Sequence, residues 1–273
     1  MRTKNIRNIS QLVALVAALI VIGLVAATTE AQSRRHYLSV VMGGEPAAAS
    51  CDLPNTQYSS LPINGSPLTV NPESDENVNL GYRGYAPVDA PRKLVELGPV
   101  HDRKAPQFPG LFADWRVPTI TGTYQRYRWD EGCDCPLDTY SRWETTVLGM
   151  GVTPGETIYT PDSGYDIGDG YEYLVMYAAE SRVTLHIGRE DEFFGYILHI
   201  EDVCVDPDLV ALYRQLHAAG RRELPVLRGH HPFGKALGQE IKIAARDWGS
   251  FIDPRSRNDW WQGRKLRMTV TNE

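Results

Sequence analysis

The chain has 273 residues, 42% of them hydrophobic and 23% charged, enough for one large globular domain or for a domain with an extended arm. Its formal net charge of −6 argues against a nucleic-acid partner, because binding to phosphates needs a basic face. The 24 Gly, 18 Pro, 14 Tyr and 6 Trp favour many short strands and turns over long helices.

The N-terminus has the layout of a secretory signal. Arg2, Lys4 and Arg7 precede an apolar run from Leu12 to Ala27, and small residues follow as far as Ala31. Residues 1–31 are therefore predicted to be a signal peptide. The alternative is an uncleaved anchor, although the run is short of the roughly 20 residues that span a membrane. In both cases residues 32 onward are expected to be extracellular or at the cell surface, and only this segment, if uncleaved, would contact the membrane.

The four cysteines are candidates for two disulfides, as an even number suggests in an exported chain. Three pairings are possible. A Cys133–Cys135 bond would close a very tight ring, so we expect Cys204 to pair with one of these two and Cys51 with the other. A metal or redox site is the rival interpretation, but Cys-x-Cys without a second close pair lacks zinc-ribbon spacing.

Composition divides the rest of the chain into four parts. Residues 32–77 are predicted to be a linker or low-order arm, because they contain Pro, Ser, Asn and Gly with few apolar runs. Residues 78–142 form a β-rich segment that includes a strand at 123–129. Residues 143–262 form the main β domain, and residues 263–273 are a tail.

Strands dominate the second half of the chain. They are predicted at residues 145–148, 171–177, 182–187, 194–200 and 240–245. One helix is expected at 206–220, where Asp206 can cap it, Pro207 takes the first position and Gly220 ends it. The predicted fold class is therefore all-β, with one inserted helix.

No familiar catalytic motif is present. The adjacent His230 and His231 diverge on an extended backbone, so a solvated turn is favoured over a metal pair. Residues 190–192 are acidic but lack the spacing of a calcium loop. Glu172, Glu240 and Asp247 are candidates for acid–base work, although nothing in the sequence shows which of them are close in space.

The densest polar motif spans residues 243–261 and contains a possible arginine and tryptophan surface. Its members are Arg246, Trp248, Arg255, Arg257, Trp260 and Trp261. In the favoured interpretation, arginine–carboxylate pairs and buried indoles hold a closing loop in place. In the other, guanidinium and indole groups bind sugars, carboxylates or a partner protein.

Read in order, short segments of residues 143–262 resemble the lysostaphin-like zinc peptidoglycan endopeptidases. The matching segments are residues 154–158, 182–186, 196–200, 233–236, 240–242 and 253–254. The resemblance implies a lysostaphin-like, duplicated-hybrid-motif type of sheet domain behind an extended N-terminal region. It places His199, Glu240 and Lys242 near the old substrate groove.

The departures from the family pattern concern the metal. Lys242 stands where the second histidine of the family's His-x-His motif belongs, and Thr145 and Gly149 stand near its earlier His-x3-Asp pair. A zinc ion needs three or four protein donors, so no metal, cofactor or catalytic residue is expected from this alignment.

These observations predict an exported, non-catalytic domain that binds a peptide, glycan or partner protein, with peptidoglycan or an envelope protein as candidate partners. The first alternative is a hydrolase of envelope polymers that uses carboxylates such as Glu240 and Asp247 placed about 5–10 Å apart. The second alternative is a structural surface protein.

Overall fold

The computed structural model describes residues 50–63, 71–100, 102–139, 142–187, 195–247 and 249–263. These residues belong to one compact unit. The predicted signal segment, Trp248, residues 190–192 and most of the C-terminal tail lie outside the described residues. In the part of the chain that the structure describes, no helix is long and apolar enough to cross a membrane.

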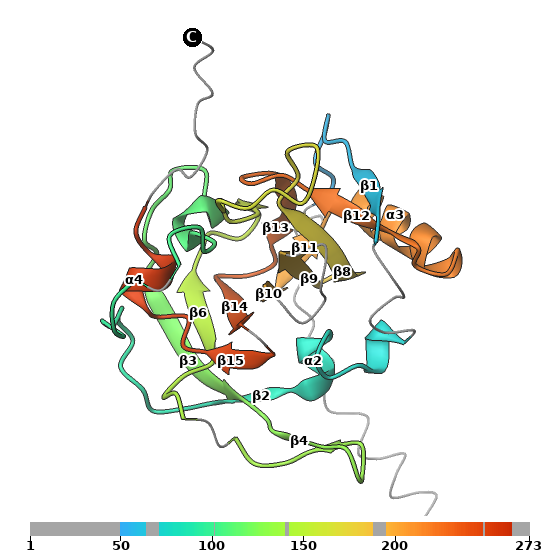
Figure 1. Ribbon diagram of the computed structural model, residues 1–273. Coiled ribbons are helices and arrows are strands. Elements are labelled where there is room, and N and C mark those ends of the chain that lie inside the picture. Colours follow the sequence, from blue (N-terminus) through green and yellow to red (C-terminus); the bar gives the residue numbers. More distant parts are fainter. Residues whose placement is uncertain are drawn as a thin grey trace, which may run out of the picture. The chain divides into compact units, whose positions relative to one another are not determined.

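An antiparallel sheet of ten strands organises this unit (Figure 1). Its order is β1-β12-β8-β9-β10-β14-β6-β3-β2, and β15 pairs with β14 beside this path. The strands are β1 (Ser59–Pro62), β2 (Tyr85–Pro87), β3 (Ile120–Arg126), β6 (Val147–Gly151), β8 (Tyr173–Ala179), β9 (Arg182–Ile187), β10 (Tyr196–Glu201), β12 (Glu223–Leu227), β14 (Glu240–Asp247) and β15 (Ser250–Ile252).

Two smaller sheets and several helices complete the unit. The three-stranded sheet has the order β11-β13-β7, and the third sheet is a hairpin. Their strands are β7 (Thr157–Tyr159), β11 (Val203–Val205), β13 (Pro232–Ala236), β4 (Trp129–Asp130) and β5 (Cys135–Pro136). The helices are α2 (Leu80–Arg83), α3 (Pro207–Ala218) and α4 (Arg257–Trp260), with 3-10 turns η1 (Pro72–Ser74) and η2 (Phe108–Leu111).

The expected strands and the long helix are confirmed, with shifts of a few residues at their ends. Asp206 caps α3 by accepting a hydrogen bond from the Asp208 amide, and Pro207 takes the first helical position. The first amides of a helix have no hydrogen-bond acceptor within it; Asp206 supplies one and Pro207 has no amide hydrogen that would need one. The start of α3 therefore follows from neighbouring residues in the sequence. The described residues also contain α2 and α4, each of four residues, so the fold is sheet-dominated with more than one helix.

The principal core lies on one face of the large sheet. Leu185, Leu198 and Ile243 come from three neighbouring strands and are completely buried there. Residues of β11, β13, α3, η2 and α4 pack against the same core, which excludes water from it. The opposite face carries a smaller cluster of Leu80, Val147, Ala244 and Phe251.

Residues 50–63 and 71–77 are ordered parts of the unit, which differs from the predicted low-order arm. Strand β1 pairs with β12, and Val78 is buried just after η1. The division at residue 143 is also not a break in the fold, because β3 pairs with β6 inside one sheet. Pairing between strands that are distant in the sequence determines which segments belong to the unit, and composition contains no information on that pairing.

The disulfide pairing differs from the expected one. Cys51 bonds Cys204, and Cys133 bonds Cys135. The β4–β5 hairpin brings Cys133 and Cys135 to a Cα separation of 5.3 Å, with Asp134 between them at a positive φ of 50°. Cys204 lies on β11, far along the chain from that hairpin but directly beside the segment that carries Cys51.

Candidate functional site

The expected groove residues Glu240 and Lys242 lie together on β14 in a group of mutually bonded polar side chains. Glu240 accepts hydrogen bonds from Thr121 and from Tyr124, whose hydroxyl lies 2.8 Å away. The Lys242 ammonium lies 3.2 Å from Glu240 and also pairs with Asp202. Burial raises the pKa of Glu240, but the hydrogen bonds from Thr121 and Tyr124 and the charge of Lys242 outweigh it, so the pKa is lowered.

His199 is completely buried and faces the second cluster rather than solvent. Its imidazole stacks on Phe251 with ring centroids 5.7 Å apart, and its Nδ1 lies 3.1 Å from the Thr184 hydroxyl. Burial lowers its pKa well below the ordinary value, and the nearby Arg246 and Arg83 lower it further. A neutral histidine without solvent access is a packing residue here.

The positions that the family resemblance assigns to the groove are partly neighbours. Lys242 is the direct cross-strand partner of Gly149, and it faces Glu201 across the other edge of β14. Thr145 is buried before β6 begins. Within the described ranges, no group of three or more His, Cys, Asp or Glu side chains is placed to hold a metal ion.

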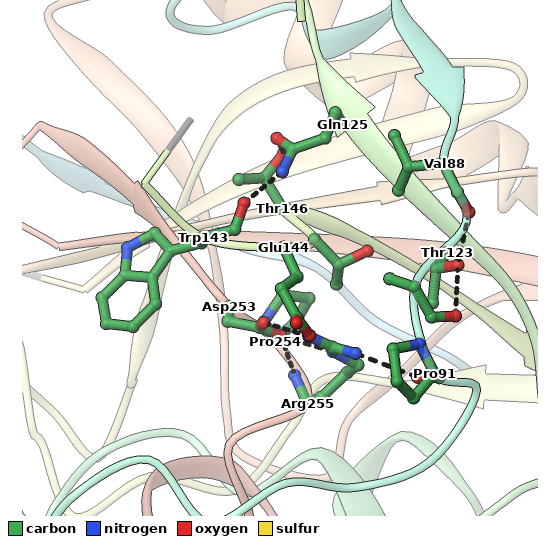
Figure 2. A network of polar contacts seen from close by, with 12 residues as sticks. Val88, Pro91, Thr123, Gln125, Trp143, Glu144, Thr146, Asp253, Pro254 and Arg255 are labelled. Atoms are coloured by element: carbon green, nitrogen blue, oxygen red, sulfur yellow. Dashed lines mark hydrogen bonds and ion pairs between the residues drawn. The ribbon is translucent and has the colours of Figure 1, made fainter. Parts of the chain in front are cut away.

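One member of the arginine and tryptophan motif, Arg255, belongs to an internal network of polar contacts (Figure 2). Arg255 is 1% exposed and forms an ion pair with Asp253 at 2.6 Å and another with Glu144 at 2.9 Å. Its third contact is the Pro91 carbonyl at 2.9 Å. These bonds join the loop after β15 to the chain before β3 and before β6. The network gives a buried guanidinium the partners that it needs.

The two tryptophans of this motif that the structure describes are internal as well. Trp260 and Trp261 are 2% and 4% exposed, and both contact Phe108, Trp260 by stacking at 5.2 Å. Their indole N–H groups donate to the carbonyls of Asp253 and Pro254. Arg257 is on the surface, where it pairs with Glu96. Neither indole is therefore available as a binding surface.

Arg246 has a different setting, because it lines a pocket of about 610 Å³. Five arginines line this pocket, together with one carboxylate, that of Asp247. The arginines are Arg83, Arg126, Arg128, Arg142 and Arg246. We call this feature the arginine pocket. In a chain with a net charge of −6, such a collection of like charges around one cavity is a local reversal of sign.

Three of the five guanidinium groups surround one aromatic ring. The carbon at the centre of each guanidinium lies 5.1 Å (Arg246), 5.4 Å (Arg126) and 5.5 Å (Arg83) from the centre of the Phe251 ring. Phe251 is on β15, Arg126 ends β3 and Arg83 ends α2. Cation–π contact with a ring face stabilises each cation modestly, but it does not remove the repulsion among the three.

The arginines of the pocket differ in how far carboxylates and hydrogen-bond acceptors offset their positive charge. Arg83 pairs with Glu76 at 3.7 Å, and Arg128 pairs with Asp138 at 2.6 Å. Arg246 donates to the backbone carbonyls of Asn77 and Gly249, which are neutral acceptors. In Arg126, Nε and Nη1 are buried and have no hydrogen-bond partner. A buried donor without an acceptor is costly, so Arg126 is the pocket arginine with the largest unmet demand for a hydrogen-bond acceptor.

The electrostatics of the pocket follow from this shortage of negative charge. Burial and, to a smaller extent, the charge of the neighbouring Arg126 together lower the pKa of Arg83 to about 10. Burial and the nearby Arg83 likewise lower the pKa of Arg246 to about 10. Burial is the larger cause of the lowered pKa of Arg126, and the charge of Arg128 is the smaller one. The charge of an anion in the pocket would raise the pKa of all three arginines and so oppose the effect of burial.

Among the residues that line the pocket, sequence reasoning identified Arg246 as a binding candidate and Asp247 as an acid–base candidate. A signal for two more was present in the predicted strand at 123–129, where Arg126 and Arg128 are two residues apart and therefore share a face. Nothing local links them to Arg83 or to Arg142, which come from other segments of the chain. Comparisons with known protein families, with curated proteins and with solved structures find no match for this chain.

Proposed function

We propose that this chain is an exported, non-catalytic domain that binds an anionic ligand in the arginine pocket. The observation that supports this most directly is the buried pair of donor atoms on Arg126, unpartnered among other guanidinium groups. A protein that only needed stability would not gather these charges, because each raises the cost of burying the next. Sites that are unfavourable without their ligand are typical of function.

The proposed binding site lies at the other end of β14 from the groove residues that the lysostaphin-like resemblance suggests. Glu240 and Lys242 already satisfy one another and their neighbours, whereas Arg246, at the other end of the strand, opens on the pocket. The resemblance itself stays a prediction. Peptidoglycan and an envelope protein remain candidate partners, since carboxylates of a peptide or glycan fit planar guanidinium groups.

Two disulfides accord with an extracellular location, where such bonds persist. The hydrolase alternative is less well supported. Glu240 and Asp247 are at opposite ends of β14, seven residues apart, which is about 23 Å along an extended strand. A carboxylate pair that hydrolyses glycosides needs a separation of roughly 5–10 Å.

Calorimetric titration with citrate and with inorganic phosphate at low salt tests the proposal. We expect saturable binding that weakens as NaCl is added, because part of the interaction is between charges in contact with water. Arg126→Met should weaken it about tenfold or more, the effect of losing a charge-assisted hydrogen bond. The melting temperature should not fall, since the variant also removes unpartnered buried donors.

Arg214→Met is the matched control. Arg214 lies on α3 with 61% of its side chain exposed, so this variant changes the net charge equally without touching the pocket. Binding should survive in the control. If wild type binds neither anion, or if both variants bind as wild type does, the pocket is not an anion site. Cosedimentation with purified peptidoglycan, competed by citrate, then tests that polymer as the natural ligand.

A further inference from the structure

The two disulfides differ in how open they are to solvent. Cys133 is exposed, together with residues 131, 132 and 134 around it, whereas Cys51 and Cys204 are both half-buried. In Figure 1 the ribbon at the label β4 lies along the lower rim of the view, away from β9 and β10 at the centre of the large sheet. A reacting thiol has to reach a sulfur atom of the bond that it breaks. Cys133 is therefore the cysteine that a thiol reaches most readily.

The exposed disulfide contributes little to holding the fold together. Cys133 and Cys135 are separated by 2 positions, compared with 153 for the other pair. Because so short a loop restricts the unfolded chain only slightly, reduction of this bond costs correspondingly little stability. The hairpin around it is a separate sheet of two residue pairs, Trp129 with Pro136 and Asp130 with Cys135. Its opening therefore breaks no pairing of the large sheet.

The backbone between the two cysteines favours the reduced form. Asp134 has a positive φ of 50°, in the left-handed region that residues other than glycine rarely occupy. This turn holds the Cα atoms of Cys133 and Cys135 5.3 Å apart, within the range that a disulfide spans. Once the bond is broken, Asp134 can return to an ordinary backbone conformation. Relief of this strain makes the bond easier to reduce.

Contacts around the other disulfide hold its two sides together. The Lys235 ammonium donates to the carbonyls of Ser50 at 2.7 Å and Asp52 at 2.9 Å, on either side of Cys51. Lys235 is also the direct cross-strand partner of Cys204. These contacts keep the two cysteines adjacent, and the long loop that they close makes the oxidised form the stable one. This second disulfide is therefore structural.

The charges of the hairpin bear on the kind of thiol that can react there. Asp130, Glu131 and Asp134 bring three carboxylates to the exposed bond, while Arg128 at the base pairs with Asp138 at 2.6 Å. The hydrogen bonds to Asp130 and Asp134 come from neutral amide, indole and hydroxyl groups, which do not cancel a charge. A thiolate is itself an anion, so the hairpin repels it unless the thiolate has basic neighbours.

We propose that Cys133–Cys135 is a thiol–disulfide exchange site that oxidises a dithiol on a basic partner protein. A thiolate of the partner attacks the Cys133 sulfur, forms a mixed disulfide and expels the Cys135 sulfur, which takes up a proton. The partner's second thiolate then attacks the partner sulfur of the mixed disulfide and expels the Cys133 sulfur. The partner loses two electrons and two protons to the two cysteines. This activity is separate from anion binding and does not rest on it.

The experiment uses two short peptides, each with a Cys-Gly-Pro-Cys dithiol, one flanked by lysines and the other by glutamates. Each reduced peptide is mixed with the full chain, the reaction is stopped with N-ethylmaleimide, and mass spectrometry locates the alkylated cysteines. We expect Cys133 and Cys135 to be alkylated at least about tenfold sooner than Cys51 and Cys204, with one peptide oxidised per chain. Alkylation of both pairs together, or of Cys51 and Cys204 first, would overturn the proposal.

The charge of the partner is tested with the same peptides. The lysine-flanked peptide should react about tenfold faster at low salt, and the ratio should fall towards one in about 1 M NaCl. Lysines also favour the thiolate of a neighbouring cysteine. Each rate is therefore divided by the rate of the same peptide with the neutral disulfide of mercaptoethanol. Equal normalised rates for the two peptides would contradict a basic partner.

Variants assign the reaction to the hairpin. Glu131→Gln should reduce the preference for the lysine-flanked peptide, because it removes a charge beside Cys133. Glu223→Gln on β12 is the matched control, since β12 lies far from β3 in the strand order, and it should keep the preference.

The double variant Cys133→Ser and Cys135→Ser should leave both peptides reduced. Peptide oxidation at the wild-type rate in this variant would assign the reaction to Cys51–Cys204 and overturn the site. If the double variant does not fold, the order of alkylation in the wild type decides by itself.

Discussion

Buried arginines occur in two contrasting settings in this protein. Arg255 has two carboxylates and a carbonyl around it, and burial of its charge is offset by bonds of good geometry. Arg126 has buried donors without acceptors and lies near other cations. The same residue type therefore stabilises a loop in one place and prepares a binding site in the other.

Substitution of Arg255 by methionine tests the structural setting. Arg255→Met leaves Asp253 buried without its partner, and breaking a buried pair in this way costs about 3–5 kcal/mol. Urea denaturation monitored by circular dichroism should show a fall of this size in the free energy of unfolding. A change below about 1 kcal/mol would mean that the network is as weak as a surface ion pair.

Glu201 is a buried carboxylate that opposes folding at neutral pH. It is 4% exposed, and its only salt bridge among the described residues is with Arg182 at 3.4 Å. Burial raises its pKa from 4.5 to about 7, an effect that the charge of Arg182 only partly counters. Between these two pH values the folded protein holds a proton that the unfolded chain has lost.

The stability due to Glu201 is therefore present below pH 4.5 and lost as the pH rises through about 7. The full difference is about 3 kcal/mol at most. Glu201→Gln removes the titration, so its stability relative to wild type should be higher at pH 8 than at pH 5. Denaturant titrations at the two values measure this; a constant difference would show that Glu201 titrates normally.

At the scale of elements, β14 connects the features described above. Glu240 and Lys242 at its start belong to the satisfied polar group, Ala244 is part of the second cluster, and Arg246 lines the arginine pocket. These four residues share one face because side chains alternate along a strand. The β14–β15 hairpin then returns Phe251 over the same face, where it contacts Arg246 and His199.

The two disulfides should contribute unequally to stability. Cys51 and Cys204 are separated by 153 residues, whereas Cys133 and Cys135 are separated by 2. Because a cross-link restricts the unfolded chain more when it closes a longer loop, replacing the first pair by serine should cost about 3–5 kcal/mol. Replacing the second pair should cost roughly 1–2 kcal/mol.

Thermal unfolding of the two double-serine variants gives the comparison, with mass spectrometry of the wild type to verify both bonds. A larger loss for the Cys133 and Cys135 pair would show that the hairpin, rather than the long loop, limits stability. Peptides that join Cys204 to Cys133 or Cys135 would contradict the pairing in the structure.

On the scale of the whole molecule, the hydrophobic clusters that the structure describes lie between Tyr58 and Trp261. The described residues form one compact unit, in which the first strand, β1, closes one edge of the large sheet. The fold of this unit therefore depends on segments from both ends of the described chain. The edge strands of the large sheet, β1 and β2, have only four and three residues, which limits the pairing of these edges with strands of other molecules.

A fragment of residues 49–263 should consequently fold by itself. We expect one cooperative unfolding transition and the same affinity for citrate as the longer chain, since the pocket lies entirely within this range. A shorter fragment that begins at residue 64 lacks β1 and Cys51 and should unfold at a lower temperature. Equal melting temperatures would mean that β1 is dispensable.

The sequence by itself determined the parts of this protein that depend on neighbours along the chain. Alternating residues in 182–187 and 240–245 indicated strands, and Asp206 with Pro207 indicated the start of α3, because both patterns act within a few residues. The sheet-dominated fold class followed from these elements. Local sequence patterns were sufficient to name Arg246 as a binding candidate. They did not distinguish Arg246, which lines a pocket, from Arg255, which is held in an internal network.

Only the tertiary structure decided which side chains meet. Arg83, Arg126 and Arg246 lie on α2, β3 and β14, and strand register together with the packing of α2 on the sheet brings them around Phe251. The same long-range contacts set the cysteine pairing and the burial of Trp260 and Trp261. Local propensity contains no information on such contacts, because their energy is realised only when distant segments pack together.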